Sequence, residues 1–524
     1  MSGLRVAAVG DRALAAYPDD PDDARASARV RALDRALRAA PFDGIVESVP
    51  SVRSLLVVFD PDRASAARVG DALRALAAAP EGRDAGTLHL VPTRYGGDEG
   101  PDLPEVARAC GLSEDAFVAR HCEREYRALM LGFRPGFAYL GWLPEELRTR
   151  RKATPRVRVP AGSVAVAALQ TAIYPSGSAG GWNLIGRTSI ELFDPSREPP
   201  VRIGPDDRVR FVPTRDAIVE PEPRASPAPG AEPVIEVLDG GLATTVQDGG
   251  RAGHRRFGVA QAGALDAPAA QAANAAVGNA PDRAVLECTV TGPALRFLRP
   301  VRFALAGADL GALLERADLG DWPVPPAVAV LARPGNVLRF AGRVRGCRAY
   351  IAFAGGLDVP VLLGSRSTDL TAGFGGYFGR TLRAGDVLAL GPPDAEHRAI
   401  ASRPWYAGQE AVEVRALRGP QDDHFPPDAL ERFFAVEWRV GTTSDRAACR
   451  LEGPRLGHTG PSEISSEGMV PGSIQVPPDG QPIVMLADGP TTGGYPKIAT
   501  VVSADLPRLA QVLPGSGRVR FREP

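Results

Sequence analysis

The stretch Ser465–Val501, SSEGMVPGSIQVPPDGQPIVMLADGPTTGGYPKIATV, carries the clearest fold signals of the chain. It predicts a strand over Gly472–Val476, a turn over Pro477–Gly480 and an apolar strand over Ile483–Ala487, because Pro-Pro-Asp-Gly reverses the chain between two apolar runs. The polar loop Asp488–Pro496 follows. Short strands joined by glycine and proline turns are typical of a mainly β protein.

The loop at the end of this stretch has the chemistry of an anion site. Backbone exposed by two glycines, flanked by hydroxyls and followed by Lys497, can cradle a carboxylate or a phosphate. Lys497 and Lys152 are the only two lysines among 61 basic residues. Because a buried lysine can lose its proton and an arginine cannot, Lys497 is a candidate catalytic residue; the alternative is a plain surface lysine. The other cradle residues are Thr492, Gly493, Gly494 and Tyr495.

The composition argues against several classes of protein. A net charge of −1 with 23% charged residues offers no basic face for nucleic acid. Five scattered cysteines form no CxxC pair, which predicts a reduced protein without a zinc or other metal site. No run approaches the ~20 apolar residues of a membrane span, and the polar N-terminus is unlike a signal peptide. We therefore expect a soluble, cytoplasmic protein.

The length of 524 residues suggests three or four domains. Two N-terminal helices, Asp22–Ala40 and Ala64–Ala79, among short strands predict a split βαβ, ferredoxin-like layer that also contains a strand at Thr87–Val91. Glycine-rich short strands predict β-barrels, and a Pro/Ala/Glu-rich run predicts a linker. The predicted domains are an α/β unit at 1–92, a β-barrel at 93–213, the linker at 214–233, a second β-barrel at 234–410 and a further β domain at 411–524.

Two segments of the chain echo one another. Val159–Trp182 contains Pro-Ala-Gly-Ser-Val, an apolar strand, a polar loop and Gly-Gly-Trp, whereas Val470–Tyr495 contains Pro-Gly-Ser-Ile, an apolar strand, a polar loop and Gly-Gly-Tyr. Glycine turns recur in any β protein, so one sequence does not prove a duplication. The echo favours two related barrels that pair about a pseudo-twofold axis, with a site between them.

Three residues are candidates for proton transfer. His121 follows a short helix and titrates near neutral pH, although a histidine at a helix end also satisfies backbone carbonyls. Asp445 and Glu467 would form a carboxylate pair whose pKa values separate, although surface ion pairs have the same pattern in sequence. The chain has no P-loop, no Rossmann GxGxxG, no HExxH and no GxSxG nucleophile motif.

Glu467 and the remaining candidates would bind substrate. Arg366 and Ser367, in Gly-Ser-Arg-Ser-Thr, offer a guanidinium among hydroxyls that suits a carboxylate or a phosphate. The plainer alternative is a turn whose arginine pairs with Asp369. Gln170 and Tyr174 lie where the polar loop of the first barrel begins.

Six long motifs from both sides of the linker resemble a known pair of families, and the resemblance covers nearly the whole chain outside the linker. The first half contains GFRPGFAYLGWLP, PRVRVPAGSVAVAALQTAIYP and GGWNLIGRTSIELFDP. These resemble the allophanate-hydrolase-subunit-1-like family, which includes the B component of bacterial ATP-dependent 5-oxoprolinase and the Kip kinase inhibitor. The second half contains GGLATTVQDGGRAGHRRFGVAQAGALD, LLGSRSTDLTAGFGGYFGR and the opening stretch, which resemble the C component of the same enzyme and the Kip antagonist. The chain is thus similar to a B–C fusion.

This resemblance implies a fold and several activities. The fold is mainly β, with an α/β N-terminal unit and cyclophilin-like β-barrels in tandem. With a separate LamB/YcsF-like protein, the A component of 5-oxoprolinase, such a chain would use ATP, with Mg²⁺, to open 5-oxo-L-proline to L-glutamate, and either protein could hold the ATP. The alternatives are the carboxyltransferase region of urea carboxylase and a non-catalytic Kip-like regulator of a histidine kinase. Neither lysine lies in a biotin-attachment context, so we expect no biotin on this chain.

Lactam opening would assign a role to each candidate. Phosphorylation of the lactam carbonyl and attack by water need cations for the phosphate charge and a base for the water. We expect Lys497 and Arg366 to bind the anion, Tyr495 and the Thr491–Gly494 loop to position the substrate, and His121 or Asp445 to move the proton. Opposite this loop we expect the echo segment of the first barrel.

Overall fold

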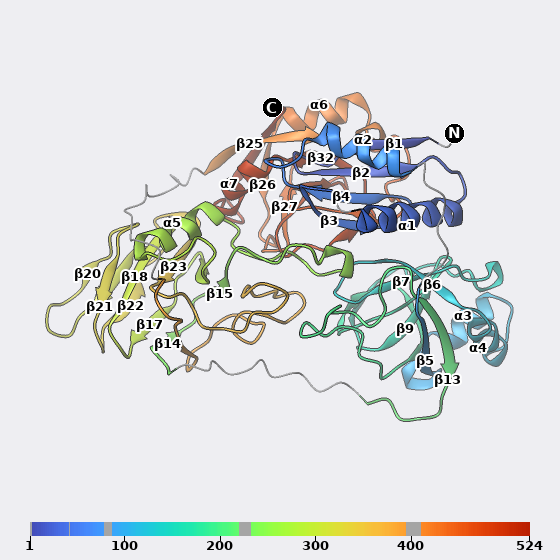
Figure 1. Cartoon of the computed structure of the whole chain (residues 1–524), viewed down its shortest axis with the longest axis horizontal. Helices are drawn as coiled ribbons and strands as arrows, with labels where there is room; N and C mark the ends of the chain where they lie inside the picture. Colours follow the sequence, from blue (N-terminus) through green and yellow to red (C-terminus); the bar gives the residue numbers. More distant parts are fainter. Residues whose placement is uncertain (1–2, 41, 78–85, 220–231, 395–409) are drawn as a thin grey trace.

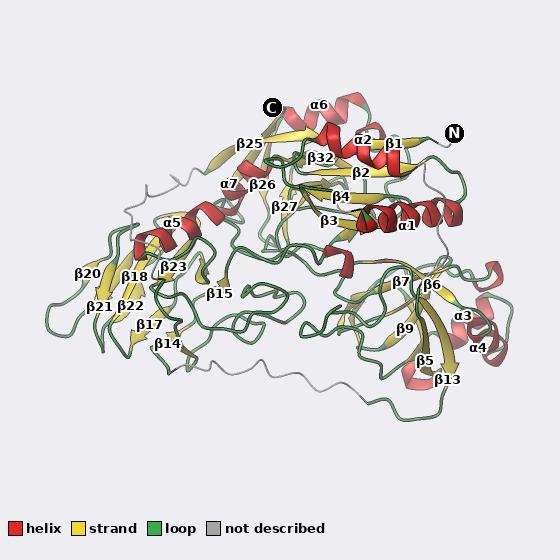
Figure 2. Cartoon of the chain, viewed as in Figure 1, coloured by secondary structure: helices red, strands yellow, loops and turns green. Residues whose placement is uncertain are grey.

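The computed structural model describes residues 3–40, 42–77, 86–219, 232–394 and 410–524. Figure 1 shows a small α/β unit at the N-terminus, a barrel after it, a region of two sheets and a second barrel at the C-terminus. Strands and loops dominate the chain (Figure 2). The predicted mainly β fold with tandem barrels is confirmed. In the described ranges, no helix is both long and apolar enough to cross a bilayer.

The N-terminal unit is an antiparallel four-stranded sheet with two helices. Its strand order is β1-β2-β4-β3, so β2 and β3 run parallel with β4 between them, which is the predicted split βαβ arrangement. Asp22 and Ser65 cap the two helices by accepting hydrogen bonds from the backbone N–H groups of Arg25 and Arg68. The elements are β1 (Leu4–Ala8), β2 (Ala13–Pro18), α1 (Asp23–Ala39), β3 (Ile45–Pro50), β4 (Leu55–Phe59) and α2 (Ala66–Leu76).

Both faces of this sheet are covered. Leu55 and Val57 on β4 pack under the helices, whereas Leu56 between them faces the opposite side, where Val470 of the C-terminal barrel packs. The unit also contacts the first barrel, since Arg31 Nε on α1 pairs with Asp206 Oδ1 at 2.9 Å. The N-terminal unit therefore connects the two barrels.

The expected strand at Thr87–Val91 belongs to a different sheet from the one predicted. It is the start of β5 (Leu88–Tyr95), which pairs parallel with β13 (Arg208–Pro213) and antiparallel with β12 (Asn183–Arg187) in the first barrel. The predicted boundary at residue 92 therefore falls inside β5. The partners of β5 lie far along the chain, so local residue spacing carried no signal for this pairing. In the N-terminal sheet, β1 is the edge strand beside β2.

The first barrel is closed, in the cyclic order β10-β7-β6-β13-β5-β12-β9. Its core contains Phe117 from α4, and the N-cap Ser113 of this helix accepts a hydrogen bond from the backbone N–H of Ala116. The other elements are η1 (Gly97–Glu99), α3 (Leu103–Ala109), α4 (Glu114–Cys122), β6 (Tyr126–Leu131), β7 (Ala138–Gly141), η2 (Glu145–Leu147), β8 (Arg156–Val159), β9 (Ser163–Ala167), β10 (Gln170–Ile173) and β11 (Ser178–Gly180).

The second barrel is closed in the equivalent order, β30-β27-β26-β33-β25-β32-β29. Each barrel also carries an extra two-stranded ladder, formed by β8 and β11 in the first barrel and by β28 and β31 in the second. In both barrels the ladder precedes the barrel strand that follows the Gly-Gly turn. The two barrels therefore repeat one plan, as the sequence echo predicted. The elements are β25 (Ala411–Arg418), η4 (Asp422–His424), α6 (Pro427–Ala435), β26 (Glu437–Val440), β27 (Ala448–Glu452), β28 (Glu467–Gly468), β29 (Ser473–Gln475), β30 (Ile483–Met485), β31 (Thr492–Gly493), β32 (Lys497–Val501), η5 (Ser503–Asp505), α7 (Leu506–Ala510) and β33 (Arg518–Arg522).

The region between the barrels consists of two sheets and not the closed barrel that we predicted. A six-stranded sheet, β20-β19-β22-β17-β14-β24, and a five-stranded sheet, β15-β16-β23-β18-β21, share one apolar core that includes Phe297 and Phe353. Barrels and two-sheet folds both bury alternate residues of short strands, so periodicity does not distinguish them. We refer to this part as the two-sheet region.

The two-sheet region begins with β14 soon after the predicted linker, whose residues 220–231 lie outside the described residues. Gly278 ends α5 in the left-handed conformation. The elements are β14 (Ile235–Asp239), β15 (Ala243–Gln247), η3 (Arg255–Phe257), α5 (Ala267–Val277), β16 (Val285–Thr289), β17 (Ala294–Phe297), β18 (Val301–Asp309), β19 (Ala312–Glu315), β20 (Trp322–Pro323), β21 (Val330–Ala332), β22 (Val337–Phe340), β23 (Arg345–Phe353) and β24 (Val387–Leu388).

Candidate functional site

Loops from both barrels and from the two-sheet region meet at one place, which we call the junction. The backbone N–H of Gly136 donates to the carbonyl of Phe257 over 2.9 Å. Arg134 Nη1 donates to the carbonyl of Thr371. The loops of the junction are Gly132–Gly136 of the first barrel, Asp248–Gly258 and Ser365–Gly379 of the two-sheet region, and Asp488–Pro496 of the second barrel.

Two glycines allow the first barrel to approach the second half so closely. A Cβ atom at Gly132 would lie 1.9 Å from Thr492 Oγ1, and one at Gly258 would lie 2.4 Å from the carbonyl oxygen of Arg134. Gly258 also has φ +78, which an L side chain rarely adopts. Any larger residue at these two positions would force the loops apart. The glycines of the GFRPGF and RRFGV motifs therefore have a physical role at this contact.

Asp248 clamps two of the junction loops together. Its carboxylate accepts hydrogen bonds from the hydroxyls of Ser365 and Ser367, both at 2.6 Å, and from the backbone N–H of Arg366. The Nε of Arg366 donates to the carbonyl of Val359 at 3.0 Å. Arg366 and Ser367, which were predicted to bind substrate, therefore form hydrogen bonds with other residues of the protein. Among the described residues, Arg366 forms no ion pair with Asp369.

A buried ion network lies under the junction. Arg446 pairs with Asp488 at 2.9 Å and with Glu287, and the Tyr350 hydroxyl donates to Glu287 at 2.8 Å. Burial raises the pKa of Asp488 to about 6 even though Arg446 opposes the shift. A carboxyl group with this pKa changes its charge near physiological pH, which suits an acid–base role.

Arg251 and Asp369 are buried beside this network. Arg251 is 1% exposed, and its Cζ lies 4.6 Å from the centroid of the Phe374 ring. Burial lowers its pKa, against the raising effect of the carboxylates of Asp369, Asp248 and Asp488. Burial also raises the pKa of Asp369. The junction therefore combines the buried cation Arg251 with two carboxyl groups, Asp369 and Asp488, whose pKa values are raised by burial.

Lys497 is also buried, and Glu467 neutralises it. The Lys497 side chain is 1% exposed, and its Nζ pairs with Glu467 Oε1. In the ladder of β28 with β31, Glu467 lies opposite Gly493. The pair of Lys497 and Glu467 is therefore placed to support the loop Asp488–Pro496, which we call the cradle loop. Lys497 does not present a free ammonium to an anion in this arrangement.

Three residues around this pair were not predicted. Gln421 Nε2 donates to Glu467 Oε1 at 2.7 Å, and its Oε1 accepts from the backbone N–H of Lys497 at 3.3 Å. The Tyr17 hydroxyl accepts from Gln421 Nε2 at 3.0 Å, and Ser54 Oγ lies 3.5 Å from Glu467 Oε2. Because Tyr17 and Ser54 belong to the N-terminal unit, Glu467 and Lys497 form a seam between that unit and the second barrel.

The cradle loop itself is partly internal. Thr492 lies against Gly132, and the carbonyl of Gly494 accepts from the backbone N–H of Ile464 at 2.9 Å. The carbonyl of Tyr495 accepts from Gln475 Nε2 at 3.1 Å, and the Tyr495 side chain is half-buried. The hydroxyls of Thr491 and Thr492 are buried and have no hydrogen-bond partner among the described residues. These hydroxyls are the free polar groups of the loop.

The structure does not bring His121 or Asp445 to Lys497. His121 lies in the core of the first barrel, where its ring nitrogens contact the hydroxyls of Tyr95 at 2.8 Å and Thr171 at 3.0 Å. Burial lowers the pKa of His121 to about 3, so it is neutral at physiological pH. Asp445 is an exposed turn residue whose Oδ1 accepts from the backbone N–H groups of Ala447 and Ala448.

Gln170 and Tyr174 stay within the first barrel. Gln170 begins β10 and is half-buried. Tyr174 is buried in an aromatic cluster with Phe137 and Trp182, and burial raises its pKa to about 12. The Tyr174 side chain serves the packing of that barrel. The first barrel reaches the junction through Gly132–Gly136 instead.

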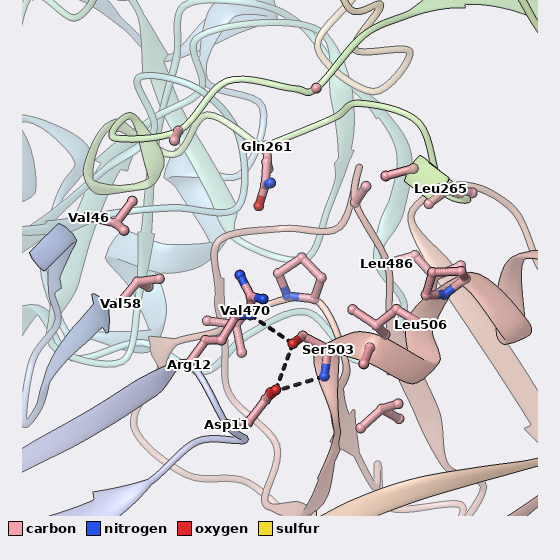
Figure 3. Close-up of a pocket in the computed structure, with 18 of the residues that line it drawn as sticks. Asp11, Arg12, Val46, Val58, Gln261, Leu265, Val470, Leu486, Ser503 and Leu506 are labelled. Carbon is pink, nitrogen blue, oxygen red and sulfur yellow. Dashed lines mark hydrogen bonds between the residues drawn. The ribbon is translucent and has the colours of Figure 1, made fainter. Parts of the chain in front are cut away.

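A cavity of about 830 Å³ lies between the N-terminal unit, the two-sheet region and the second barrel (Figure 3). At one end, Asp11 accepts from the backbone N–H and the hydroxyl of Ser503 at 3.0 and 2.6 Å, and Arg12 Nε donates to the same hydroxyl. The charged lining residues are Asp11, Arg12, Glu47, Asp60, Asp62 and Arg255. Four carboxylates against two guanidinium groups make this cavity unfavourable for an anion.

The site residues that the sequence did not mark share one property: their partners are far away in the chain. Arg251 and Asp488 both lie in the long motifs, but neither has a local neighbour that marks it as buried. Two threonines, two glycines and a lysine led the sequence prediction to one loop of the second barrel, and that loop lies at the junction. The chemistry around that loop comes from Arg251, Asp369 and Asp488 as well as from the lysine.

Comparisons with known proteins agree with this architecture. Residues 4–203 match the family "Carboxyltransferase domain, subdomain C and D", and residues 257–523 match "Carboxyltransferase domain, subdomain A and B". The crystal structure of TTHA0988 superposes with a TM-score of 0.84 at 38% identity, covering 98% of this chain and 100% of that one.

Curated relatives match the two halves separately. The B subunit of 5-oxoprolinase from Escherichia coli O157:H7 is 39% identical over 226 residues, which are 42% of this chain and 100% of that protein. The C subunit of 5-oxoprolinase from Escherichia coli K12 is 38% identical over 283 residues, which are 53% of this chain and 88% of that protein. Urea amidolyase of Lachancea kluyveri is 33% identical over 305 residues, which are 54% of this chain and 16% of that protein. The chain therefore belongs to the carboxyltransferase-domain family, as a fusion of a half like the B component of 5-oxoprolinase with a half like the C component.

Proposed function

We propose that this chain is the B–C component of an ATP-dependent 5-oxoprolinase, which opens 5-oxo-L-proline to L-glutamate together with a separate A component. The observation that carries the proposal is the match of each half to one 5-oxoprolinase subunit, over 100% of the first and 88% of the second. The junction supports it as well, because both halves contribute loops to it. A site made by two proteins elsewhere would here be made by one chain.

The chemistry of lactam opening fits the junction better than the large cavity. The lactam oxygen takes the γ-phosphoryl group of ATP, and water then adds to the carbonyl carbon. The C–N bond breaks, the ring nitrogen leaves as the amine of glutamate, and a second water releases phosphate. Both the substrate and the phosphate are anions, so the four carboxylates of the cavity would repel them. The junction offers Arg251 and the hydroxyls of Thr491 and Thr492.

We assign proton transfer at the junction to Asp488. Its pKa of about 6 lets it accept a proton from the attacking water at physiological pH. His121 is too deeply buried in its own barrel for this role, and Asp445 lies in an exposed turn. Lys497 and Glu467 hold the Thr491–Gly494 loop in position, and Arg366 and Ser367 hold Asp248. These four are positioning residues in the proposed reaction.

ATP is a substrate of the proposed reaction, and either this chain or the A component would hold it. Among the described residues, no group of three or more His, Cys, Asp or Glu side chains could hold a metal ion. Mg²⁺ would therefore arrive with the nucleotide or be held by the LamB/YcsF-like A component. The need for ATP and the five free cysteines support a cytoplasmic location.

The proposal is tested with the purified chain and its own A component. ADP and glutamate should form in equal amounts from ATP and 5-oxo-L-proline, and omission of either protein should abolish both. Asp488→Asn should lower kcat by roughly 10²-fold or more, because a general base is lost. Asp71→Asn on the exposed face of α2 is the control and should leave kcat unchanged. A folded mixture that forms no glutamate would contradict the proposal.

A urea-type carboxyltransferase is the second candidate, favoured by the family to which the chain belongs and by the similarity to urea amidolyase. Such an activity would need biotin on another protein. Lys497 is fully buried, and Lys152 Nζ pairs with Asp102 at 2.9 Å, so neither is an accessible biotin-bearing lysine. Allophanate formed from urea and carboxybiotin would support this candidate. Binding to a histidine kinase without any turnover would support a Kip-like regulator.

A further inference from the structure

The described part of the chain contains four arginines that are more than nine-tenths buried, and one of them differs from the others. Arg255 pairs with Glu47 at 2.8 Å, Arg446 with Asp488 at 2.9 Å and Arg348 with Glu287 at 3.7 Å. No carboxylate among the described residues lies within 4.0 Å of an Arg251 nitrogen. A buried guanidinium without a paired anion is costly, so an unpaired one calls for an explanation.

The surroundings of Arg251 hold its side chain in place and leave two donors free. Its Nη2 donates to the carbonyl of Ser367, and the ring of Phe374 covers one face of the guanidinium. Its Nε and Nη1 are buried and have no hydrogen-bond partner among the described residues. An unpaired donor in a buried site is unfavourable, because it has lost its hydrogen bond to water and gained none in the protein. The geometry therefore presents two oriented N–H edges to a missing acceptor.

The neighbouring carboxyl groups cannot supply that acceptor as they stand. Asp248 is occupied by the hydroxyls of Ser365 and Ser367, and Asp488 is held by Arg446. Asp369 is buried, accepts from the backbone N–H of Ala372 at 2.9 Å, and lies outside ion-pair distance of Arg251. Burial favours the protonated form of Asp369. This raised pKa weakens the competition of the Asp369 carboxylate for the Arg251 donors, although Arg251 itself opposes the shift.

We infer that Arg251 binds a small oxyanion, a carboxylate or a phosphate, at the junction. We call this binding position the seat. The hydroxyls of Thr491 and Thr492, also buried and without a partner among the described residues, lie on the loop that follows Asp488. The seat is narrow, because a Cβ atom at Gly375 would lie 2.8 Å from Arg251 Nη2. The identity of the anion rests on the proposed function, in which it is the carboxylate of 5-oxoproline or a phosphate of ATP. The binding of an oxyanion does not depend on that function.

The experiment measures binding to the full chain alone, by isothermal titration calorimetry, without the A component and without turnover. The probes are 5-oxo-L-proline, inorganic phosphate and 2-pyrrolidinone, which is the same lactam without the carboxylate. Each is titrated into the wild type, Arg251→Met and Arg251→Lys. Arg302→Met, on an exposed position of β18, is the matched control.

A seat for the substrate carboxylate predicts that 5-oxo-L-proline binds the wild type and the Arg302→Met variant equally. Arg251→Met should weaken this binding roughly 10- to 100-fold, the effect of one charge-assisted contact, and 2-pyrrolidinone should bind weakly to both. Arg251→Lys should keep part of the affinity. If phosphate shows this dependence and 5-oxo-L-proline does not, the seat belongs to a phosphate group. Equal binding of both anions to the wild type and Arg251→Met would overturn the inference.

Thermal unfolding separates binding from a structural role. Removing an unpaired buried cation should leave the Tm of Arg251→Met unchanged or raise it, whereas the anion should raise the Tm of the wild type only. A fall in Tm as large as that of Arg446→Met would assign Arg251 to the structural network and contradict the inference. An anion that binds through Arg251 in a chain that yields no glutamate would leave the inference standing and refute the proposed function.

Discussion

The two barrels share one strand order but have different residues at equivalent positions. We call these positions the seam of each barrel. In the first barrel, Asp102 accepts from Lys152 at 2.9 Å, from Arg156 at 2.7 Å and from the backbone N–H of Leu184. In the second, Gln421 takes the place of Asp102 and accepts from the backbone N–H of Lys497. The registers Gly180 with Arg156 and Gly493 with Glu467 align the two seams. Both lysines of the chain therefore lie at this seam.

The difference between the seams follows from what covers them. The Lys152 side chain is 24% exposed, so water helps to solvate its charge. The Lys497 side chain is 1% exposed, because the N-terminal unit places Tyr17 and Ser54 over it. The same structural element is therefore partly solvent-exposed in the first barrel and an interface between domains in the second. The acidic partner Glu467 is what makes a buried lysine tolerable there.

The barrel cores repeat the same comparison. His121 packs on Phe211 with ring centroids 4.6 Å apart, and Phe433 stacks on Phe521 at 4.7 Å. The Tyr126 hydroxyl donates to the carbonyl of His121, and Trp438 Nε1 donates to the carbonyl of Phe433. His121 therefore occupies the place of a core phenylalanine. This equivalence explains why it is buried and neutral.

The largest expected effect comes from removing the lysine of the covered seam. Lys497→Met leaves Glu467 buried without its cation, so the free energy of unfolding should fall by about 3–5 kcal/mol. In Lys152→Met, Arg156 still neutralises Asp102, so the loss should stay below about 1 kcal/mol. Urea unfolding followed by circular dichroism measures both variants.

A double variant controls this comparison. Lys497→Met combined with Glu467→Leu removes both charges and should recover most of the stability lost by Lys497→Met alone. Equal losses for Lys497→Met and Lys152→Met would show that burial by the N-terminal unit does not distinguish the seams.

The glycines of the two Gly-Gly turns should differ in the same assay. A Cβ atom at Gly180 would lie 2.3 Å from the hydroxyl of Tyr174, a buried ring that cannot move easily, whereas one at Gly493 would meet the flexible side chains of Gln475 and Met469. We expect Gly180→Ala to cost about 2–3 kcal/mol and Gly493→Ala about 1 kcal/mol. The reverse order would mean that the second turn is the more rigid one.

The pH dependence of stability tests the core position of His121. The folded state keeps it neutral down to about pH 3, while the unfolded chain takes up a proton below about pH 6.5, so stability falls as the pH drops through this window. At pH 5 the loss amounts to about 2 kcal/mol. His121→Phe introduces the core residue of the second barrel. The contribution of His121 to the fall in the free energy of unfolding between pH 6.5 and 5 should therefore disappear. An unchanged slope would place the titrating group elsewhere.

Tyr17→Phe should have a small effect. The variant removes only the hydroxyl that contacts Gln421, so we expect a loss of about 1 kcal/mol in the free energy of unfolding. Hydrogen exchange should show the change at β28 and β32 and not at β8 and β12. Equal changes at both seams would mean that Tyr17 acts through general stability rather than through this contact.

Some parts of the fold could be predicted from the sequence because their signals are local. The turn at Pro477–Gly480, the capped helices and the Gly-Gly turns lie within a few residues of their causes. The repeated RVRF at Arg208–Phe211 and Arg518–Phe521 would have aligned the barrels directly. The two sheets between the barrels were not distinguishable from a barrel, since both bury alternate residues.

The site was only partly predictable for the same reason. The loop before Lys497 was identified from its own glycines and threonines. The partners of Lys497 and Arg251 come from segments that spacing does not connect to them: Tyr17 from the N-terminal unit, and Ser367 and Phe374 from the two-sheet region. Burial turned the expected anion-binding lysine into half of an ion pair, and it left an arginine without a carboxylate.

The central claim is that both halves of this chain act together in ATP-dependent lactam opening. The most direct test follows 5-oxo-L-proline labelled with ¹³C at the lactam carbonyl by NMR, in a mixture of the chain, its A component, ATP, Mg²⁺ and urea. We predict that the label moves to the side-chain carboxylate of glutamate in step with ADP release, and that no allophanate forms. An unchanged lactam signal in a mixture where both proteins are folded and associated would contradict the account.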